Sequence, residues 1–439
     1  MLKKAIINIL ASATKRAIKR EKPMIIAITG SFGKSSTKEA IAIAMGAREP
    51  GSQIRSSIKN YNNEFGVPFT VLGVHAPGKD PLKWLKVMLS AIWIGWGFGR
   101  IGANTLILEM GADHPGDLDW LVRIAPPSIS VITSVAEAHS ENFGSIEEVA
   151  KEKASLVRAL PKDGLAILNN DDPRVTAMRK EMECEAQYFG FSEGSDIRVE
   201  GTEVMMEEDE RNHAHPIGIR VALEIQQRIY ELSLKGTIGR PQAWSVSCAL
   251  LVARARGIEL QKAIERLEKE YHGIPGRTRI IPGIKYTTLI DDSYNAASPK
   301  TVISAINDIA QMPIINGQRR ICALGEMREL GEYSDSAHAS VGEAVAKNGI
   351  DILVLCGTLS RTIADSAIQN GMDPKSVFLF EESAEAGRAL QDQLVSGDIV
   401  LVKGSQGSRM EKIVRELMAE PLEAPFLLVR MDDEWQRIS

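Results

Sequence analysis

The sequence predicts an α/β protein that contains two parallel sheets in succession, because apolar strand-like runs alternate with helical patterns in two stretches of the chain. The runs of the first stretch are Met24–Thr29, Thr105–Glu109, Ile129–Thr133 and Leu165–Asn169. Those of the second stretch are Thr287–Ile290, Arg320–Ala323, Ile352–Leu355, Val377–Phe380 and Ile399–Val402. We therefore expect a central parallel-sheet domain followed by a C-terminal Rossmann-like α/β domain.

Different patterns lie between these two stretches. From about residue 195 to 236, polar and apolar residues alternate around an acidic turn, which predicts antiparallel strands. Residues 243–269 have the spacing of two helices. The segment 272–277 contains two glycines and a proline, and it predicts a linker between the domains.

These patterns divide the chain into three regions. Residues 1–22 predict an N-terminal amphipathic helix, because apolar residues recur there at helical spacing between basic ones. Residues 23–278 form the predicted central domain, which contains an apolar insertion at 76–104. Residues 279–439 form the predicted C-terminal domain.

Composition limits the class of protein. A chain of 439 residues is long enough for two or three domains, each with its own core. The net charge of −5 argues against a general nucleic-acid-binding protein, which is normally basic. The four cysteines are far apart and form no C-x-x-C pair, so we expect free thiols in a reducing cytoplasm rather than disulfides or a zinc site.

A glycine turn follows the first predicted strand and leads directly into a predicted helix. The turn contains Gly30 and Gly33, and Lys34 and Ser35 come next. Backbone N–H groups at such a turn face phosphates, the lysine reaches the β- and γ-phosphates, and the hydroxyl binds Mg²⁺. The spacing differs from G-x-x-x-x-G-K-[ST] because Ile28 occupies the first glycine position. The strand-to-helix context still predicts a central domain of the P-loop ATPase type.

Two further polar side chains follow predicted strands. Glu109 ends the second apolar run, and His139 lies shortly after the third. Ligands gather at the carboxyl ends of parallel strands, so both residues are expected near the phosphate loop. A lone histidine is more often structural. The glycine turn, Glu109 and His139 together nevertheless indicate metal and phosphate chemistry.

Two apolar segments admit alternative interpretations. The helix at 1–22 is interpreted as a docking helix, with contact to a membrane surface as the alternative. The segment 81–98 contains Trp84, Trp93 and Trp96, half of the six tryptophans. It is short and interrupted by lysines, so we expect a packed surface helix rather than a membrane span. A lipid-facing or partner-facing patch is the alternative.

The ordered motifs of this chain together resemble the Mur ligases, the ATP-dependent amide ligases of cell-wall precursor synthesis. The asparagine segment, Asn60–Pro68, and the segment Leu324–Gly331 are most similar to the type that joins D-alanyl-D-alanine to a UDP-muramoyl tripeptide. The matching segments are Thr29–Ser36, Asn60–Pro68, Glu109–His114, His139–Lys153, Asn169–Asp172, Pro275–Arg277, Leu289–Ala296, Leu324–Gly331 and Gly397–Glu411.

The resemblance assigns roles to individual residues. The nucleotide contacts that it implies are Thr29, Gly30, Ser31, Gly33, Lys34, Ser35, Ser36, Gln242, Arg277 and Asp292. The implied ligands of Mg²⁺ are Ser35, Glu109, His139 and Lys153, of which His139 and Lys153 count with Lys34 as catalytic. The implied substrate contacts are Asn62, Asn63 and Asn295.

Lys153 matches the lysine that is carbamylated in these enzymes. CO₂ converts its neutral amine into a carbamate, which is an anionic oxygen ligand that suits Mg²⁺. Lys151 is a competing candidate two residues earlier. Without the resemblance, both lysines would be interpreted as part of a solvated helix surface.

The resemblance also implies a mechanism and partners. A substrate carboxylate attacks the γ-phosphate of ATP, an acyl phosphate forms, and an amine captures the activated carbonyl. The implied partners are small molecules, namely a muramoyl-peptide precursor and D-alanyl-D-alanine. We expect a cytoplasmic monomer that binds no nucleic acid.

Three features depart from the family's pattern. Only about two dozen residues precede the phosphate loop, where the family has a further domain that holds the uridine nucleotide. The family's adenine-binding Gly-x-His-Asn-x-x-Asn is replaced at 239–245, where Gln242 is the candidate substitute for the asparagine amide. The segment 81–98 extends a connection that is shorter in the family.

Three functions therefore remain open. The first is the ligase reaction on a UDP-muramoyl tripeptide. The second is a related amide ligation on a lipid-linked or other non-nucleotide acid, with the tryptophans facing lipid. A nucleotide-switched binding protein comes last, because a switch has no need for Glu109, His139 and Lys153 together.

Overall fold

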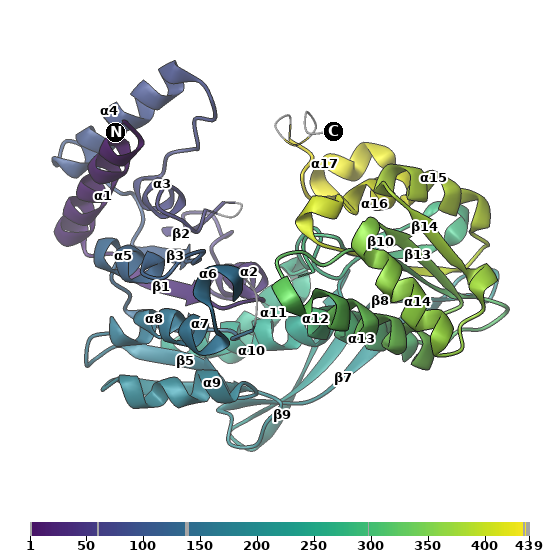
Figure 1. The fold of residues 1–439 in the computed structure, drawn as a ribbon. Coiled ribbons are helices and arrows are strands. Elements are labelled where there is room, and N and C mark those ends of the chain that lie inside the picture. The colour runs from purple at the N-terminus through teal and green to yellow at the C-terminus, as the bar shows by residue number, and fades with distance from the viewer. Residues whose placement is uncertain (1, 59–60, 137–139, 297, 433–434, 436–439) are drawn as a thin grey trace.

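The computed structural model describes residues 2–58, 61–136, 140–296, 298–432 and 435. The candidate metal ligand His139 therefore lies outside the described residues. The chain forms two lobes, each built on its own sheet, with the N-terminal residues in the first lobe and the C-terminal residues in the second (Figure 1).

The first lobe contains a nine-stranded sheet in the order β2-β3-β1-β4-β5-β6-β7-β8-β9. Neighbouring strands from β2 to β7 are parallel, and β8 and β9 extend the sheet in antiparallel pairs. The strands are β1 Met24–Thr29, β2 Ile54–Ser56, β3 Thr105–Glu109, β4 Ile129–Ile132, β5 Leu165–Asn169, β6 Glu185–Gly190, β7 Ile197–Glu208, β8 Ala214–Ile225 and β9 Arg228–Lys235.

Helices cover both faces of this sheet, and the alternation of side chains along β1 shows why. Ile26 and Ile28 pack into the core beneath α2, α10 and α11, whereas Ile25 and Ala27 pack into the core beneath α1, α3, α4 and α5. A strand covered on both faces needs apolar residues on both, and this run is apolar from Met24 to Ile28. The helices are α1 Leu2–Glu21, α2 Lys34–Ala44, α3 Gly66–Leu72, α4 Pro81–Gly95, α5 Asp117–Ile124, α6 Ser140–Phe143, α7 Ile146–Lys153, α8 Ser155–Arg158, α9 Pro173–Ala177, α10 Arg240–Ala255 and α11 Leu260–Glu270.

The second lobe contains a six-stranded sheet in the order β10-β11-β15-β12-β13-β14. Only β10 is antiparallel to its neighbour. The strands are β10 Arg279–Pro282, β11 Thr288–Asp292, β12 Arg320–Gly325, β13 Ile352–Cys356, β14 Val377–Phe380 and β15 Ile399–Lys403. The helices are α12 Pro299–Ala310, α13 Ser334–Lys347, α14 Arg361–Gln369, α15 Ser383–Gln393, α16 Glu411–Leu417 and α17 Ala424–Leu427.

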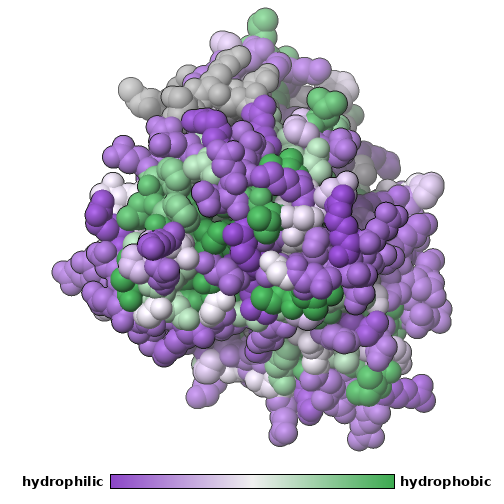
Figure 2. Space-filling model, turned by 90° about the vertical axis from the view of Figure 1, so that its right-hand side faces the viewer, coloured by the Kyte–Doolittle hydropathy of each residue, from purple (hydrophilic) through white to green (hydrophobic). Residues whose placement is uncertain are grey.

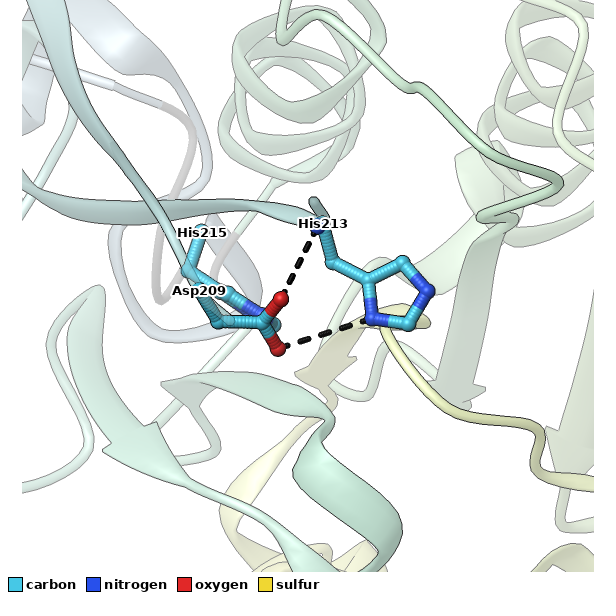
Figure 3. Close-up of side chains that lie close together, drawn as sticks. All are labelled: Asp209, His213 and His215. Carbon is cyan, nitrogen blue, oxygen red and sulfur yellow. Dashed lines mark hydrogen bonds and ion pairs between the residues drawn. The ribbon is translucent and has the colours of Figure 1, made fainter. Parts of the chain in front are cut away.

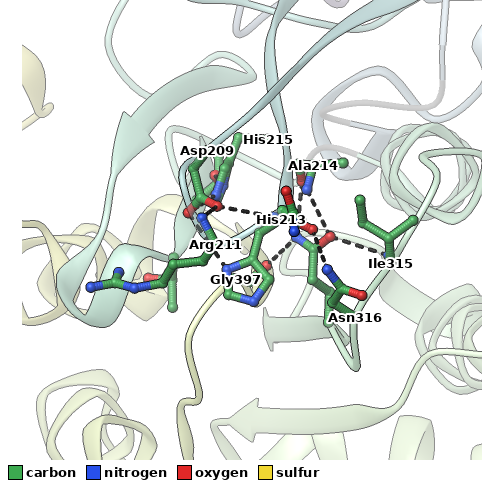
Figure 4. Close-up of polar contacts among 12 residues, drawn as sticks. Asp209, Arg211, His213, Ala214, His215, Ile315, Asn316 and Gly397 are labelled. Atoms are coloured by element: carbon green, nitrogen blue, oxygen red, sulfur yellow. Dashed lines mark hydrogen bonds and ion pairs between the residues drawn. The ribbon is translucent and has the colours of Figure 1, made fainter.

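The β7–β8 hairpin connects the two lobes a second time, in addition to the chain itself. Its turn contacts the second lobe through Gln318, whose amide accepts a hydrogen bond from Ala214 N and donates to Ala214 O, both at 2.9 Å. The same amide donates to Gly397 O at 2.7 Å (Figure 4). His215 Nδ1 lies 2.9 Å from Thr288 Oγ1 of β11. These contacts attach the end of the hairpin to the second lobe.

The fold class predicted from the sequence is confirmed. The apolar runs form parallel strands, the segment 195–236 contains the antiparallel strands β7 to β9, and residues 243–269 fall in α10 and α11. The predicted linker at 272–277 lies in the irregular connection between α11 and β10. All four cysteines are buried and free, as expected. The domain limits themselves stay a prediction.

The two apolar segments both form helices. The segment 81–98 contains α4, which begins where the Asp80 carboxylate accepts hydrogen bonds from the backbone N–H groups of Leu82 and Lys83. Within the described ranges, no helix is both long and apolar enough to cross a bilayer.

Figure 2 shows the molecule from the side of the second lobe, where hydrophilic residues cover most of the surface.

Asp308 is a carboxyl group that the fold places in an unfavourable environment. It belongs to α12 and lies close to Gly239, since a Cβ on that glycine would be 3.0 Å from Asp308 Oδ2. Burial, with a smaller contribution from the charge of Asp292, raises the pKa of Asp308 to about 7, and Arg240 opposes this shift.

We predict that Asp308→Asn stabilises the protein at pH 8 but has little effect at pH 4.5. The raised pKa favours the folded state at low pH, and this contribution is lost as the pH rises from about 4 through 7. An amide carries no charge to bury, so the gain at pH 8 should be on the order of 1 kcal/mol. Urea unfolding of both proteins at the two pH values checks this. An equal difference at both would contradict the raised pKa.

Candidate active site

The phosphate loop joins β1 to α2, and two glycines are required for its shape. Gly33 has a φ of 82° at the position before α2, a conformation that favours glycine. Gly30 lies against the end of β4, where a Cβ would be 1.9 Å from Thr133 Oγ1. The backbone can approach β4 this closely only because no side chain intervenes.

Residues at the end of β4 hold the loop in place. Thr133 Oγ1 donates a hydrogen bond to Phe32 O at 2.5 Å. Ser134 Oγ accepts one from Phe32 N at 3.0 Å, and Ser134 O accepts one from Ser31 N at 3.0 Å. Thr133 and Ser134 were not among the site residues predicted from the sequence. The signal for them was their position at the end of an apolar run, at the same edge of the sheet as the loop.

Lys34 points back along the loop that it follows. Its Nζ donates to Gly30 O at 2.7 Å. Burial lowers the pKa of Lys34, Glu109 opposes this shift, and Arg277 adds to it. The ammonium group therefore lies inside the turn in which a phosphate group would be held.

Glu109 is the charged centre of the loop region, with 2% of its surface exposed. Its Oε2 accepts a hydrogen bond from Ser35 Oγ at 2.8 Å, and its Oε1 accepts one from Asn62 Nδ2 at 3.1 Å. Lys38 Nζ lies 3.8 Å from the same Oε2. The structure thus brings together three residues that the sequence analysis selected. It adds Lys38, which lies one helical turn after Lys34.

Oxygen donors of this kind suit Mg²⁺. The hydroxyl of Ser35 and the carboxylate of Glu109 are hard ligands at the end of a parallel strand. Nearby at the end of β1, Thr29 Oγ1 is buried and has no hydrogen-bond partner. The donor set therefore fits a hard divalent cation.

Lys153 and Lys151 occupy different environments at the end of α7. Lys153 is 6% exposed, and burial lowers its pKa to about 7, with a further contribution from the charge of Lys34. The side chain of Lys151 is 70% exposed and lies 3.5 Å from Glu148. Only Lys153 faces the interior near the phosphate loop.

One cavity of about 560 Å³ brings many of the predicted residues together. It lies between the phosphate loop, the asparagine segment, the loop after β3 and α7, and the N-terminal end of α1 also lines it. Predicted site residues in its wall are Gly30, Ser31, Lys34, Asn62, Asn63 and Lys153. Other lining residues include Lys3, Ile7, Asp113, His114 and Trp120.

Gln242 and Arg277 meet at the connection between the lobes. Gln242 is buried, and its Nε2 donates to Arg277 O at 3.1 Å and to Thr278 Oγ1 at 3.0 Å. Its Oε1 accepts a hydrogen bond from Tyr271. The amide is thus engaged within the protein, and its contact with adenine stays a prediction. The Arg277 guanidinium lies 4.0 Å from the centre of the Tyr294 ring.

Two residues of the second lobe that were predicted to belong to the site accept hydrogen bonds from the same lysine. Lys403 Nζ donates to Asp292 Oδ2 at 2.6 Å and to Asn295 O at 3.1 Å. Neither Asp292 nor Asn295 lines the cavity beside the phosphate loop. Their contacts with nucleotide and substrate stay predictions.

Ser36, another predicted nucleotide contact, lies in the first turn of α2 in the first lobe and is buried, at 4% exposure.

Asp209, His213 and His215 form a separate polar cluster at the turn of the β7–β8 hairpin. Each of the three side chains offers one atom that could bind a metal ion, and these three atoms lie within 4.8 Å of one another (Figure 3). Asp209 Oδ2 lies 3.1 Å from His215 Nε2 and 3.5 Å from His213 Nδ1. The cationic side chains of Arg211 and Lys285 line the adjacent hollow, which disfavours a divalent cation. We interpret the cluster as part of the hairpin's attachment.

Comparison with known proteins agrees with this geometry. Residues 97–235 match the Mur ligase middle domain, and residues 276–406 match the Mur ligase, glutamate ligase domain. A UDP-N-acetylmuramoyl-tripeptide–D-alanyl-D-alanine ligase of Mycobacterium bovis is 30% identical over 90% of this chain and 73% of its own length. The enzyme of the same name from Bacillus subtilis is 25% identical over 91% and 76%.

A solved structure shows the same fold. The MurF ligase of Thermotoga maritima in complex with ADP has a TM-score of 0.73 and 23% identity, over 93% of this chain and 83% of its own. The two domain matches and the 30% identity across most of both chains lead to one conclusion, which is that this chain belongs to the Mur ligase family.

Proposed function

We propose that this protein is an ATP-dependent amide ligase that joins D-alanyl-D-alanine to a UDP-muramoyl tripeptide. The observation that supports this most directly is the cavity beside the phosphate loop. Lys34, Asn62 and Lys153 line it, and Glu109 lies buried beside it. A protein that only bound nucleotide would have no need for a second lysine buried next to the phosphate-binding one.

The proposed reaction begins between two anions, the substrate carboxylate and the γ-phosphate of ATP. The carboxylate oxygen attacks phosphorus, the bond to the β-phosphate oxygen breaks, and ADP leaves with the electron pair. Lys34 offsets the negative charge around the transferred phosphoryl group. Ser35, Glu109, His139 and a modified Lys153 would hold Mg²⁺, which supplies further positive charge at the phosphates when bound.

The second step forms the amide. The neutral amine of D-alanyl-D-alanine attacks the carbonyl carbon of the acyl phosphate, and a tetrahedral intermediate forms. This intermediate expels phosphate and loses a proton from nitrogen. Acyl phosphates hydrolyse in water, so the lobes are expected to close over the cavity, with the connection at 271–278 bending.

The environment of Lys153 supports its proposed carbamylation. A pKa of about 7 leaves a large fraction of the side chain as neutral amine at neutral pH. That nitrogen attacks the carbon of CO₂, a proton leaves the nitrogen, and a carbamate anion remains. The new anion faces the charge of Lys34, which is the main charged group that disfavours the ammonium form of Lys153.

The substrate contacts are assigned to three asparagines. Asn62 and Asn63 line the cavity, and Asn62 is held there by its hydrogen bond to Glu109. Asn295 lies in the second lobe and would approach the substrate on closure.

We further propose that the enzyme acts as a monomer in the cytoplasm, where ATP is available.

A second candidate function is amide ligation on a lipid-linked acid. One observation favours it: the outer face of α4 exposes large apolar side chains, including Trp93 and Trp96. The first turns of α1, which packs beside α4, line the cavity through Lys3 and Ile7. An acid held at a membrane surface would enter the cavity from this side.

A phosphate-release assay tests the main proposal. We expect release from ATP and Mg²⁺ only when both UDP-muramoyl tripeptide and D-alanyl-D-alanine are present, with the amide product detected by mass spectrometry. Lys34→Ala should lower the rate by more than about 100-fold, because the phosphoryl group loses its main cation. Lys162→Ala removes a side chain that is 86% exposed and should leave the rate unchanged.

The same assay separates the alternatives. Release only with a lipid-linked tripeptide would replace the main proposal by the second candidate. Release that depends on neither acid would favour a nucleotide-dependent switch and contradict both ligase functions. Full activity of Lys34→Ala would remove the phosphate-loop assignment.

We predict that Lys153→Ala lowers amide formation by at least about 100-fold while ADP binding changes little, since a metal ligand is lost but the loop is intact. Lys151→Ala, the matched control, should behave as wild type. With ¹³C-labelled bicarbonate, NMR should show a carbamate signal in the wild type and in Lys151→Ala but not in Lys153→Ala. A carbamate that disappears in Lys151→Ala instead would transfer the role to that lysine.

A further inference from the structure

The outer face of α4 carries a stripe of exposed apolar side chains. Leu82 is 78% exposed, Leu85 57% and Leu89 59%. Trp93 and Trp96 continue the stripe toward the end of the helix at 58% and 48%. These positions repeat every three or four residues, so the side chains lie on one face. Apolar groups gathered in this way on a protein surface mark an interaction site.

The opposite face of α4 is fixed against α1, so the exposed stripe cannot turn inward. Val87, Ala91 and Gly95 form the buried face. The helices approach so closely that a Cβ on Gly95 would lie 2.6 Å from the Cα of Ala13. Both helices form an outer edge of the first lobe, away from the second lobe (Figure 1). The apolar stripe therefore stays exposed within the described part of the chain.

Positive charge surrounds this stripe. Residues 1–22 and 79–100 contain 11 of the 52 lysines and arginines but only 2 of the 57 acidic residues. Lys83 and Lys86 are exposed on α4 itself, and the Arg16 guanidinium of α1 lies 4.6 Å from the centre of the Trp96 ring. The rest of the chain is strongly acidic, since the net charge of the whole protein is −5.

We infer that the α1–α4 edge binds the surface of an anionic lipid bilayer, with α4 lying in the plane of the interface. Leucines would enter the boundary between head groups and acyl chains, and the tryptophans would lie at the head-group level, where their amphipathic rings are favoured. The surrounding lysines and arginines would attract the anionic head groups, while the acidic remainder of the protein stays in water. Charge of one sign around an apolar stripe matches a lipid surface better than a second copy of this edge, which would bring like charges together.

This inference goes beyond the proposed ligase function and does not depend on it. Membrane binding needs neither ATP nor an acid substrate. It applies equally to a ligase that acts on a nucleotide-linked or on a lipid-linked acid. The ligase assay and a vesicle assay can therefore fail independently of each other.

Sedimentation of the full-length protein with vesicles tests the inference. We expect binding to vesicles of phosphatidylcholine with 30% phosphatidylglycerol, weaker binding to pure phosphatidylcholine, and weakening with added salt. Leu85→Ser/Leu89→Ser should lower the bound fraction at least tenfold, and Lys83→Glu/Lys86→Glu should remove the preference for anionic lipid. Tryptophan fluorescence should shift to the blue when the wild type binds vesicles, and Leu85→Ser/Leu89→Ser should show no such shift.

A matched control exists in the second lobe. Leu422 and Phe426 are 89% and 74% exposed, and Leu422→Ser/Phe426→Ser should bind vesicles as the wild type does. All changed residues are exposed, and equal melting temperatures will show that the variants fold. The inference is overturned if the wild type does not sediment with anionic vesicles, or if Leu85→Ser/Leu89→Ser binds them as well as the control Leu422→Ser/Phe426→Ser does. A dimer in solution that Leu85→Ser/Leu89→Ser dissociates, without vesicle binding, would instead assign the stripe to a second copy.

Discussion

The site depends on one buried charge, the carboxylate of Glu109 at the end of β3. A carboxylate with 2% exposure is stable only when polar groups surround it. Here they come from Ser35 and Lys38 of α2 and from Asn62 of the segment before α3. The same interactions therefore set the orientation of the helix that follows the phosphate loop and the position of the asparagine segment. The cavity is the space that remains between these elements.

Much of the fold could be predicted because it depends on local patterns. The run Met24–Thr29 is apolar from Met24 to Ile28, which indicated a strand of a parallel sheet, and β1 has these bounds. The antiparallel strands followed from strict alternation, as in β8. In the site, Glu109 was expected near Lys34 and Ser35 because strand ends meet at one edge of a parallel sheet, and it contacts Ser35.

Other features depend on contacts between distant residues, which no local pattern contains. Nothing in the sequence indicated that Gln242 is held by Tyr271 and by the backbone of Arg277. Lys151 and Lys153 are identical in type and two residues apart, and only the packing of α7 decides which one is buried. The attachment of the β7–β8 turn to Gln318 joins residues more than a hundred positions apart. The roles of the site residues remain predictions that the experiments above address.

That attachment has a mechanical consequence. Two bodies joined at one point can swing in any direction, whereas two separate joints leave only rotation about the line between them. Here one joint is the chain connection near Arg277. The other is the β7–β8 turn, which is held by hydrogen bonds with Gln318 and Thr288. We therefore expect the lobes to rotate relative to each other about the line through these two connections. Weakening the connection at the hairpin turn would misalign the lobes on closure, even though every residue around the phosphate loop stays unchanged.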